Sequence, residues 1–143
     1  MEWVLDLEKG YVLAELTARN DIVTAICLSV DDAVEVKEVI KVYGQPDTVG
    51  GFYGQGEVYG RSVILLYDEG LVMILVDYGS PFIETWRVSP GDGVNRMCFF
   101  DPDLFTQLVG DEIITAIGSD ANALVAALAP WEGYSTVALH PVP

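Results

Sequence analysis

The feature of this sequence that most constrains its fold is a resemblance between two glycine-centred segments. Residues 5–16 (LDLEKGYVLAEL) match residues 65–76 (LLYDEGLVMILV), and the match places Gly10 on Gly70. Each segment holds two β-rich runs on either side of a short turn, which is the pattern of two β-strands joined as a hairpin. The sequence therefore predicts two hairpins of the same kind.

A second match follows the first and includes both cysteines. Residues 23–28 (VTAICL) align with residues 94–99 (VNRMCF), and each segment leads into an acidic helix cap. The order of hairpin, strand and helix in both copies predicts an internal repeat. Chance similarity is the alternative, because apolar strands resemble one another. The expected copies cover about residues 4–44 and 62–110.

A helix is predicted in residues 31–43 (DDAVEVKEVIKVY), where apolar residues recur at helical spacing. Asp32 and Glu35 form a variant of the capping box at its start, and Gly44 with Pro46 supplies the stop. The apolar stripe consists of Val36, Val39, Ile40 and Tyr43.

The rest of the chain reads mainly as strands. Asp68 to Gly70 form a hairpin turn, and the strands after it are expected to continue as an antiparallel meander. Asp101 and Pro102 open a short second helix. These expected strands are residues 62–68, 71–77, 82–88 and 94–100.

The predicted fold class is α+β, with helices packed on one face of an antiparallel sheet. The 143 residues suit a single domain, 1–143, in which residues 111–143 form a C-terminal extension. That extension is expected to contain a helix from about Asp120, ended by Pro130, and a last strand in YSTVALH.

Charge narrows the range of partners. The chain has 22 acidic and 7 basic residues, a net charge of −15, which repels nucleic acid and anionic lipid. Its longest aliphatic run, residues 71–76, is far shorter than the ~20 residues that span a bilayer, so membrane insertion is not expected. High acidity serves solubility in one interpretation and attraction to a basic partner in the other.

Residues 41–60 (KVYGQPDTVGGFYGQGEVYG) hold six glycines but do not fit a phosphate site. A phosphate-binding loop precedes a helix and carries Gly-Lys-Ser/Thr, whereas this segment follows a helix and has Glu57 after its glycine. Aromatic residues on such a connector are typical of protein contact surfaces. Phe52, Tyr53 and Tyr59 are therefore the predicted partner-binding residues. In the alternative, these rings fold back onto the sheet.

Catalytic residues and cofactor sites are not predicted. The single histidine, His140, lies three residues from the end, which makes a catalytic triad improbable. Asp31 with Asp32, and Asp101 with Asp103, precede predicted helices, so capping explains them better than acid–base or metal chemistry. No cofactor and no metal are expected, and the chain is predicted not to be an enzyme.

Cys27 and Cys98 fall at matched positions, and neither belongs to a Cys-x-x-Cys pair. Buried free thiols are one interpretation. A disulfide is the other, and it requires the two strands to be close neighbours.

The segments VIKVYGQPDTV and VNRMCFF resemble the helix-plus-antiparallel-sheet modules of bacterial envelope proteins. These are the tandem modules of β-lactamase inhibitor protein-like proteins and the single modules of small outer-membrane assembly lipoproteins. The resemblance covers residues 1 to about 110 and includes the Tyr-Gly-x-Pro-Asp helix exit at residues 43–47. It implies a curved sheet with helices behind it and a role in binding proteins. The helix expected before the first hairpin is missing.

The leading functional hypothesis is a non-catalytic protein-binding or structural module of a bacterial envelope or surface protein. The alternative is an acidic inhibitor or immunity-type protein that blocks a basic enzyme surface, and a small-molecule carrier comes third. Residues 1–10 carry no export signal, so an extracytoplasmic location requires that the natural chain begin before Met1; otherwise a cytoplasmic location is expected. An exposed edge strand would allow a homodimer.

Overall fold

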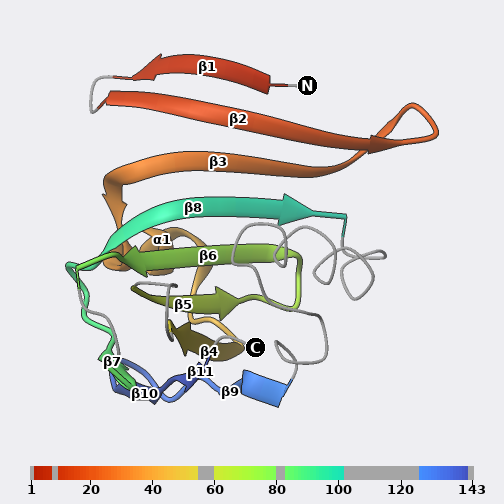
Figure 1. Cartoon of the computed structure of the whole chain (residues 1–143). Coiled ribbons are helices and arrows are strands. Elements are labelled where there is room, and N and C mark those ends of the chain that lie inside the picture. The colour runs from red at the N-terminus through yellow and green to blue at the C-terminus, as the bar shows by residue number, and fades with distance from the viewer. Residues whose placement is uncertain (1, 8–9, 55–59, 80–82, 102–125, 142–143) are drawn as a thin grey trace.

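One large, mainly antiparallel sheet dominates the computed structural model, which describes residues 2–7, 10–54, 60–79, 83–101 and 126–141 (Figure 1). One helix, α1 (Val36–Tyr43), is present among these residues. The strands are β1 (Glu2–Leu7), β2 (Gly10–Arg19), β3 (Ile22–Glu35), β4 (Thr48–Tyr53), β5 (Arg61–Leu66), β6 (Leu71–Asp77), β7 (Thr85–Arg87), β8 (Gly93–Phe100), β9 (Ala129–Pro130), β10 (Thr136–Ala138) and β11 (His140–Pro141).

The predicted α+β class is wrong. In the described part of the chain, far more residues lie in strands than in the single short helix. Helices therefore do not form a layer over the sheet there. The second helix predicted from Asp101 and most of the one predicted from Asp120 lie outside the described residues. The last predicted strand is present, divided between β10 and β11.

The strands pair in the order β1-β2-β3-β8-β6-β5-β4-β11, with β9 also pairing with β4. In Figure 1 they lie side by side from the N-terminal hairpin to β4. The expected meander is wrong, because β7 leaves this sheet and pairs with β10 in a separate two-stranded sheet. Strand β8 then inserts between β3 and β6, where it can bury alternate side chains on both faces.

The predicted internal repeat is also contradicted. Strand β3 runs directly into α1, whereas β7 intervenes between β6 and β8 and has no counterpart between β2 and β3. The hairpins themselves are present: β1 pairs with β2 around Gly10, and β5 pairs with β6. The similar segments share the apolar, β-rich composition of strands, as the chance alternative held.

Apolar residues fill both faces of the sheet. Along β5 and β6 successive side chains point to opposite faces, so Val63 and Leu65 join one buried cluster while Ile64 and Leu66 join the other. Helix α1 packs on the first face through Val36 and Val39, together with Trp86, Val88, Val137 and Leu139. Burial on both sides explains the almost unbroken apolar runs of these two strands.

Helix α1 confirms the predicted helix but begins later than expected. Its N-cap is Glu35, whose backbone N–H donates to the Glu38 carboxylate at 2.8 Å. Residues 31–35 extend β3 instead, so the capping role predicted for Asp31 and Asp32 is wrong. The helix ends at Gly44, which has a φ of 82°.

A disulfide joins the central strands β3 and β8. Cys27 lies directly opposite Cys98 in the ladder, and both residues are buried. The disulfide interpretation therefore holds, and the cysteines are not free thiols. Within the described ranges, no helix is long and apolar enough to cross a membrane.

Candidate contact cleft

The three aromatic residues predicted to contact a partner have different positions. Phe52 in β4 is 2% exposed and belongs to the second core cluster, so its ring folds back onto the sheet. Tyr53 is half-buried and packs against the first cluster, directly opposite Arg61 in the β4–β5 ladder. Tyr59 lies outside the described residues. Of the three predicted residues, Tyr53 therefore lies beside the start of β5, where Arg61 is located.

Arg61 lies in a polar cleft that has a volume of about 610 Å³. The cleft lies at the start of β5, the end of β6, along β7 and at the start of β8. Residues that carry its chemistry are Arg61, Asp77, Tyr78, Trp86, Arg87 and Asp92. They come from separate parts of the sequence, and sequence analysis did not single out any of them.

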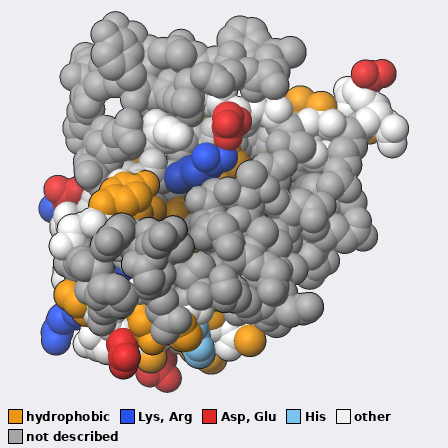
Figure 2. Space-filling view, viewed as in Figure 1, with side chains coloured by type: hydrophobic (Ala, Val, Ile, Leu, Met, Phe, Trp, Pro, Cys, Tyr) orange, Lys and Arg blue, Asp and Glu red, His pale blue; other side chains and the backbone are white. Residues whose placement is uncertain are grey.

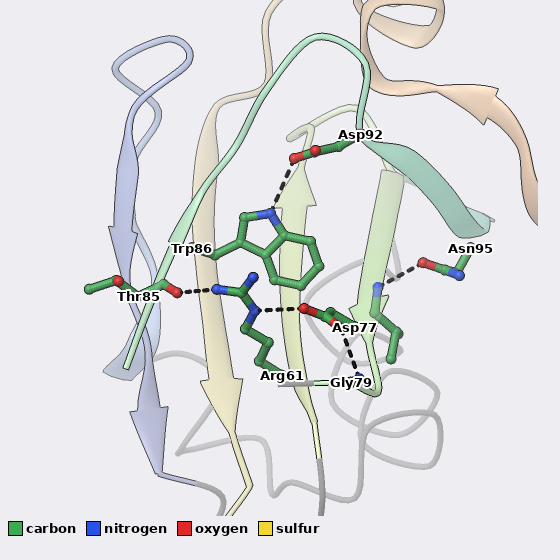
Figure 3. Close-up of polar contacts among 8 residues, drawn as sticks. Arg61, Asp77, Gly79, Thr85, Trp86, Asp92 and Asn95 are labelled. Carbon is green, nitrogen blue, oxygen red and sulfur yellow. Dashed lines mark hydrogen bonds and ion pairs between the residues drawn. The ribbon is translucent and has the colours of Figure 1, made fainter. Parts of the chain in front are cut away.

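Three contacts fix the Arg61 guanidinium (Figure 3). Its Nε donates to the Asp77 Oδ2 at 3.1 Å, and its Nη1 donates to the Thr85 carbonyl at 2.5 Å. The Cζ atom lies 4.6 Å from the centroid of the Trp86 ring, within the range of a cation–π contact. Asp77 belongs to β6, and Thr85 and Trp86 both belong to β7, so Arg61 connects β5 with these two strands.

The Trp86 indole is buried and held at its polar end. Its Nε1 donates to the Asp92 Oδ2 at 3.1 Å, as Figure 3 shows, and the same oxygen accepts the Ser89 backbone N–H at 2.9 Å. The turn-rich residues 89–93 therefore position Asp92 against the indole. A buried Trp N–H needs such an acceptor, because an unpaired donor there is costly.

The end of β6 is fixed in a similar way. The Asp77 Oδ1 accepts the Gly79 N–H at 2.9 Å, and the Asn95 side-chain oxygen accepts the Val76 N–H at 2.7 Å (Figure 3). The Asn95 contact continues the link between β6 and β8 beyond their last backbone pair. Together these bonds fix the backbone on both sides of Tyr78, a residue that is 78% exposed.

The cleft also differs in charge from the chain as a whole. Two of the seven basic residues, Arg61 and Arg87, line it together with two carboxylates, so its formal charge is balanced in a protein of net charge −15. Arg87 is exposed and has no ion pair among the described residues. Among the coloured side chains of Figure 2, those of Lys and Arg lie apart from one another.

The acidic side chains of the cleft take part in structural hydrogen bonds. The carboxylates of Asp77 and Asp92 both accept structural hydrogen bonds, and His140 does not line the cleft. In the described ranges, no group of three His, Cys, Asp or Glu side chains is placed to hold a metal ion. What the cleft offers is a fixed Arg–Trp stack beside an exposed tyrosine and an exposed arginine.

Comparison with protein-family models, with curated proteins and with solved structures finds no match for this chain. The resemblance to envelope modules therefore stays a prediction. Function has to be argued from the geometry of the cleft.

Proposed function

We propose that this chain is a non-catalytic protein-binding module and that the cleft around Arg61 and Trp86 is its contact surface. The observation that carries the proposal is Tyr78, a large aromatic side chain exposed at the rim of a cleft with a fixed floor. Tyr, Trp and Arg are the residue types that dominate binding energy at protein interfaces. All three types occur in this cleft.

The rigidity of the cleft floor favours binding. An interface side chain that must be ordered on association costs roughly 0.5–1.5 kcal/mol. Arg61 is already held by Asp77, Thr85 and Trp86 in the free protein, so this cost is largely met before a partner arrives. A partner then has to order only the exposed side chains, chiefly Tyr78 and Arg87.

The segment predicted from sequence borders the same cleft. Gly54 donates its N–H to the Gly60 carbonyl at 2.8 Å, so the chain leaves β4 and returns to β5 beside Arg61. Because Tyr53 and Arg61 face each other across the ladder, their side chains lie on one face of the sheet. Tyr53 therefore remains a predicted contact residue next to the cleft, and Tyr59, which lies outside the described residues, remains a prediction from sequence.

A location outside the cytoplasm accords with this proposal. The disulfide between Cys27 and Cys98 is of the kind that persists in oxidising compartments. This supports the envelope or surface location expected from the resemblance.

The test uses a photo-reactive amino acid in place of Tyr78 in the source cell, followed by identification of any cross-linked protein. A matched probe replaces Ile22, which is 64% exposed at the β2–β3 turn. We expect a partner that cross-links from position 78 only, and whose affinity for the purified protein falls at least tenfold in a Tyr78→Ala, Arg87→Ala variant. An unchanged affinity in that variant, measured beside Ile22→Ala, would remove the cleft from the proposal.

A second candidate is an acidic inhibitor of a basic enzyme, which the net charge of −15 favours. Screened attraction between rim charges weakens steeply as salt rises, whereas contacts in a fixed aromatic cleft are less sensitive. Affinity that collapses between low and moderate ionic strength would favour the inhibitor, and affinity that persists would favour the cleft.

A further inference from the structure

A second cavity lies on the face of the sheet covered by α1, and it shares no residue with the contact cleft. Its volume is about 140 Å³, much smaller than the ~300 Å³ or more of a pocket for a drug-sized ligand. It is suited to a small chemical group. The side chains that line it include Tyr43, Tyr67, Glu69, Leu71, Phe99 and Phe100.

Aromatic rings form much of the wall. The Tyr43 ring lies 6.5 Å from that of Tyr67 and 6.2 Å from that of Phe99, measured between centroids, at interplanar angles of 63° and 57°. Tyr67 is buried and its hydroxyl donates to the Gly44 carbonyl at 2.8 Å, whereas Tyr43 is 51% exposed. The pocket thus has a fixed inner ring and an accessible outer one.

The electrostatics of the pocket favour a positive charge. Glu69, an acidic residue, is among those that line the pocket, and the aromatic faces carry negative electrostatic potential. Helix α1 ends at Tyr43, and the C-terminal end of a helix attracts cations. Lys41 in the last helical turn does not line the pocket, so no described side chain of the lining supplies the cation itself.

The Tyr67 hydroxyl stays protonated over the physiological pH range. Burial raises the pKa of its phenol to about 12, and the nearby Tyr134 and Asp47 add to the increase. The ring therefore stays neutral.

We propose that this pocket binds an organic ammonium group, such as a trimethylammonium or an alkylated lysine side chain. Several aromatic rings around one small site are the arrangement by which proteins recognise such cations. The small volume matches a single substituted ammonium head rather than a whole ligand. The proposal concerns this pocket alone and does not depend on the function of the cleft.

An ordinary apolar hole is the competing explanation, and the charge of the ligand separates the two. Choline and dimethylbutanol, its uncharged carbon isostere, have nearly the same shape. Each is titrated to tens of millimolar into the purified chain while the backbone amide signals are followed by two-dimensional NMR. We expect choline to shift the signals of residues 43, 67, 69–71 and 99, and the isostere to leave them in place. Equal shifts with both compounds, or none with choline, would overturn the proposal.

Variants test the residues directly. Tyr43→Leu removes a ring face and Glu69→Gln removes the carboxylate, and each is expected to weaken choline binding by roughly tenfold or to abolish it. Tyr78→Leu, which alters an exposed ring in the other cleft, is the matched control. Because Tyr43 and Glu69 are exposed, unchanged amide signals elsewhere establish that the variants fold. Choline binding that survives both variants would contradict the assignment.

The source of the ammonium group is identified by a third arm. A short peptide that carries trimethyllysine is compared with choline and with the same peptide carrying unmodified leucine. Tighter binding of the trimethyllysine peptide than of choline points to a protein side chain, and equal binding points to a free small molecule. Either result upholds the pocket, whereas equal binding of the leucine peptide would overturn it.

Discussion

The disulfide between Cys27 and Cys98 gives a prediction whose magnitude follows from the chain itself. The two residues are separated by 71 positions in sequence, so the bond closes a long loop in the unfolded chain. The chain-entropy model assigns a loop of this length about 4 kcal/mol of stabilisation. Since a domain of this kind is stable by about 10 kcal/mol, the bond supplies a large share of that stability.

The perturbation is a Cys27→Ala, Cys98→Ala variant, compared with the oxidised and the fully reduced wild-type protein in urea unfolding. The reduced wild type retains both sulfur atoms, so it separates loss of the bond from loss of buried volume. We expect the reduced wild type to lose about 4 kcal/mol of unfolding free energy, and the Ala variant to lose more because it also lacks two buried sulfur atoms. Their m-value should rise, because an unbridged denatured chain exposes more surface.

Two results would refute this reasoning. One is a difference below about 1 kcal/mol between the oxidised and reduced proteins, which would mean that loop closure contributes little. The other is free thiols in the natively purified protein, measured by mass spectrometry after alkylation, which would mean that the bond does not form.

Three further predictions concern stability. Phe52→Ala should cost about 4 kcal/mol in urea unfolding, because the ring is fully buried, and a cost below about 1 kcal/mol would place the ring at the surface. Gly60→Ala should cost about 2 kcal/mol, because φ is 97° and a Cβ would lie 2.7 Å from the Asp77 carbonyl oxygen. Gly91→Ala has open space and serves as its control, so equal costs would contradict the argument. The pKa of Tyr67 is higher in the folded protein, so its contribution to stability is fully present below pH 10 and is lost as the pH rises through about 12. A Tyr67→Phe variant should not show this loss of stability in alkaline unfolding curves.

Local patterns predicted the local structure well. The hairpin turn at residues 68–70 and the helix that ends at Gly44 depend on turn and cap chemistry within a few residues. The helix start was wrong for a non-local reason. Val34 and Glu35 pair with Val94 and Gly93 of β8, and this pairing extends β3 through a sequence that otherwise favours a helix cap.

Sheet order lay beyond the sequence because strand pairing depends on distant segments. The strand around residues 85–87 has the same alternation as its neighbours, yet it pairs with β10 near the C-terminus instead of joining a meander. Nothing in residues 85–87 themselves shows whether they pair with β10 or with the strands that precede and follow them in the sequence. The α+β prediction is wrong for a related reason. The residue types at positions 31–35 favour a helix cap, but in the folded chain these residues extend strand β3, which pairs with β8.

The glycines of residues 50–51 are explained by packing. A Cβ at Gly50 would lie 2.6 Å from the Ala127 carbonyl oxygen, and one at Gly51 would clash with Ser62 and with Leu139. These glycines let neighbouring segments approach β4 closely. This close packing also buries Phe52, which sequence analysis placed on an exposed connector.

The contact cleft could not be foreseen from single motifs. Arg61, Asp77, Trp86 and Asp92 are ordinary residues in their own segments, and only the sheet brings them together. A weak signal existed in the turn-rich residues 89–93, which hold Asp92 against the indole. From the sequence alone, those residues are expected only to connect the strands predicted at residues 82–88 and 94–100.

Amide hydrogen exchange, measured on the protein alone and with its cross-linked partner, tests the central claim most directly. The contact cleft predicts that protection on binding centres on residues 76–78, 85–87 and 92–93. Protection confined to other parts of the chain, with these residues exchanging as in the free protein, would contradict it.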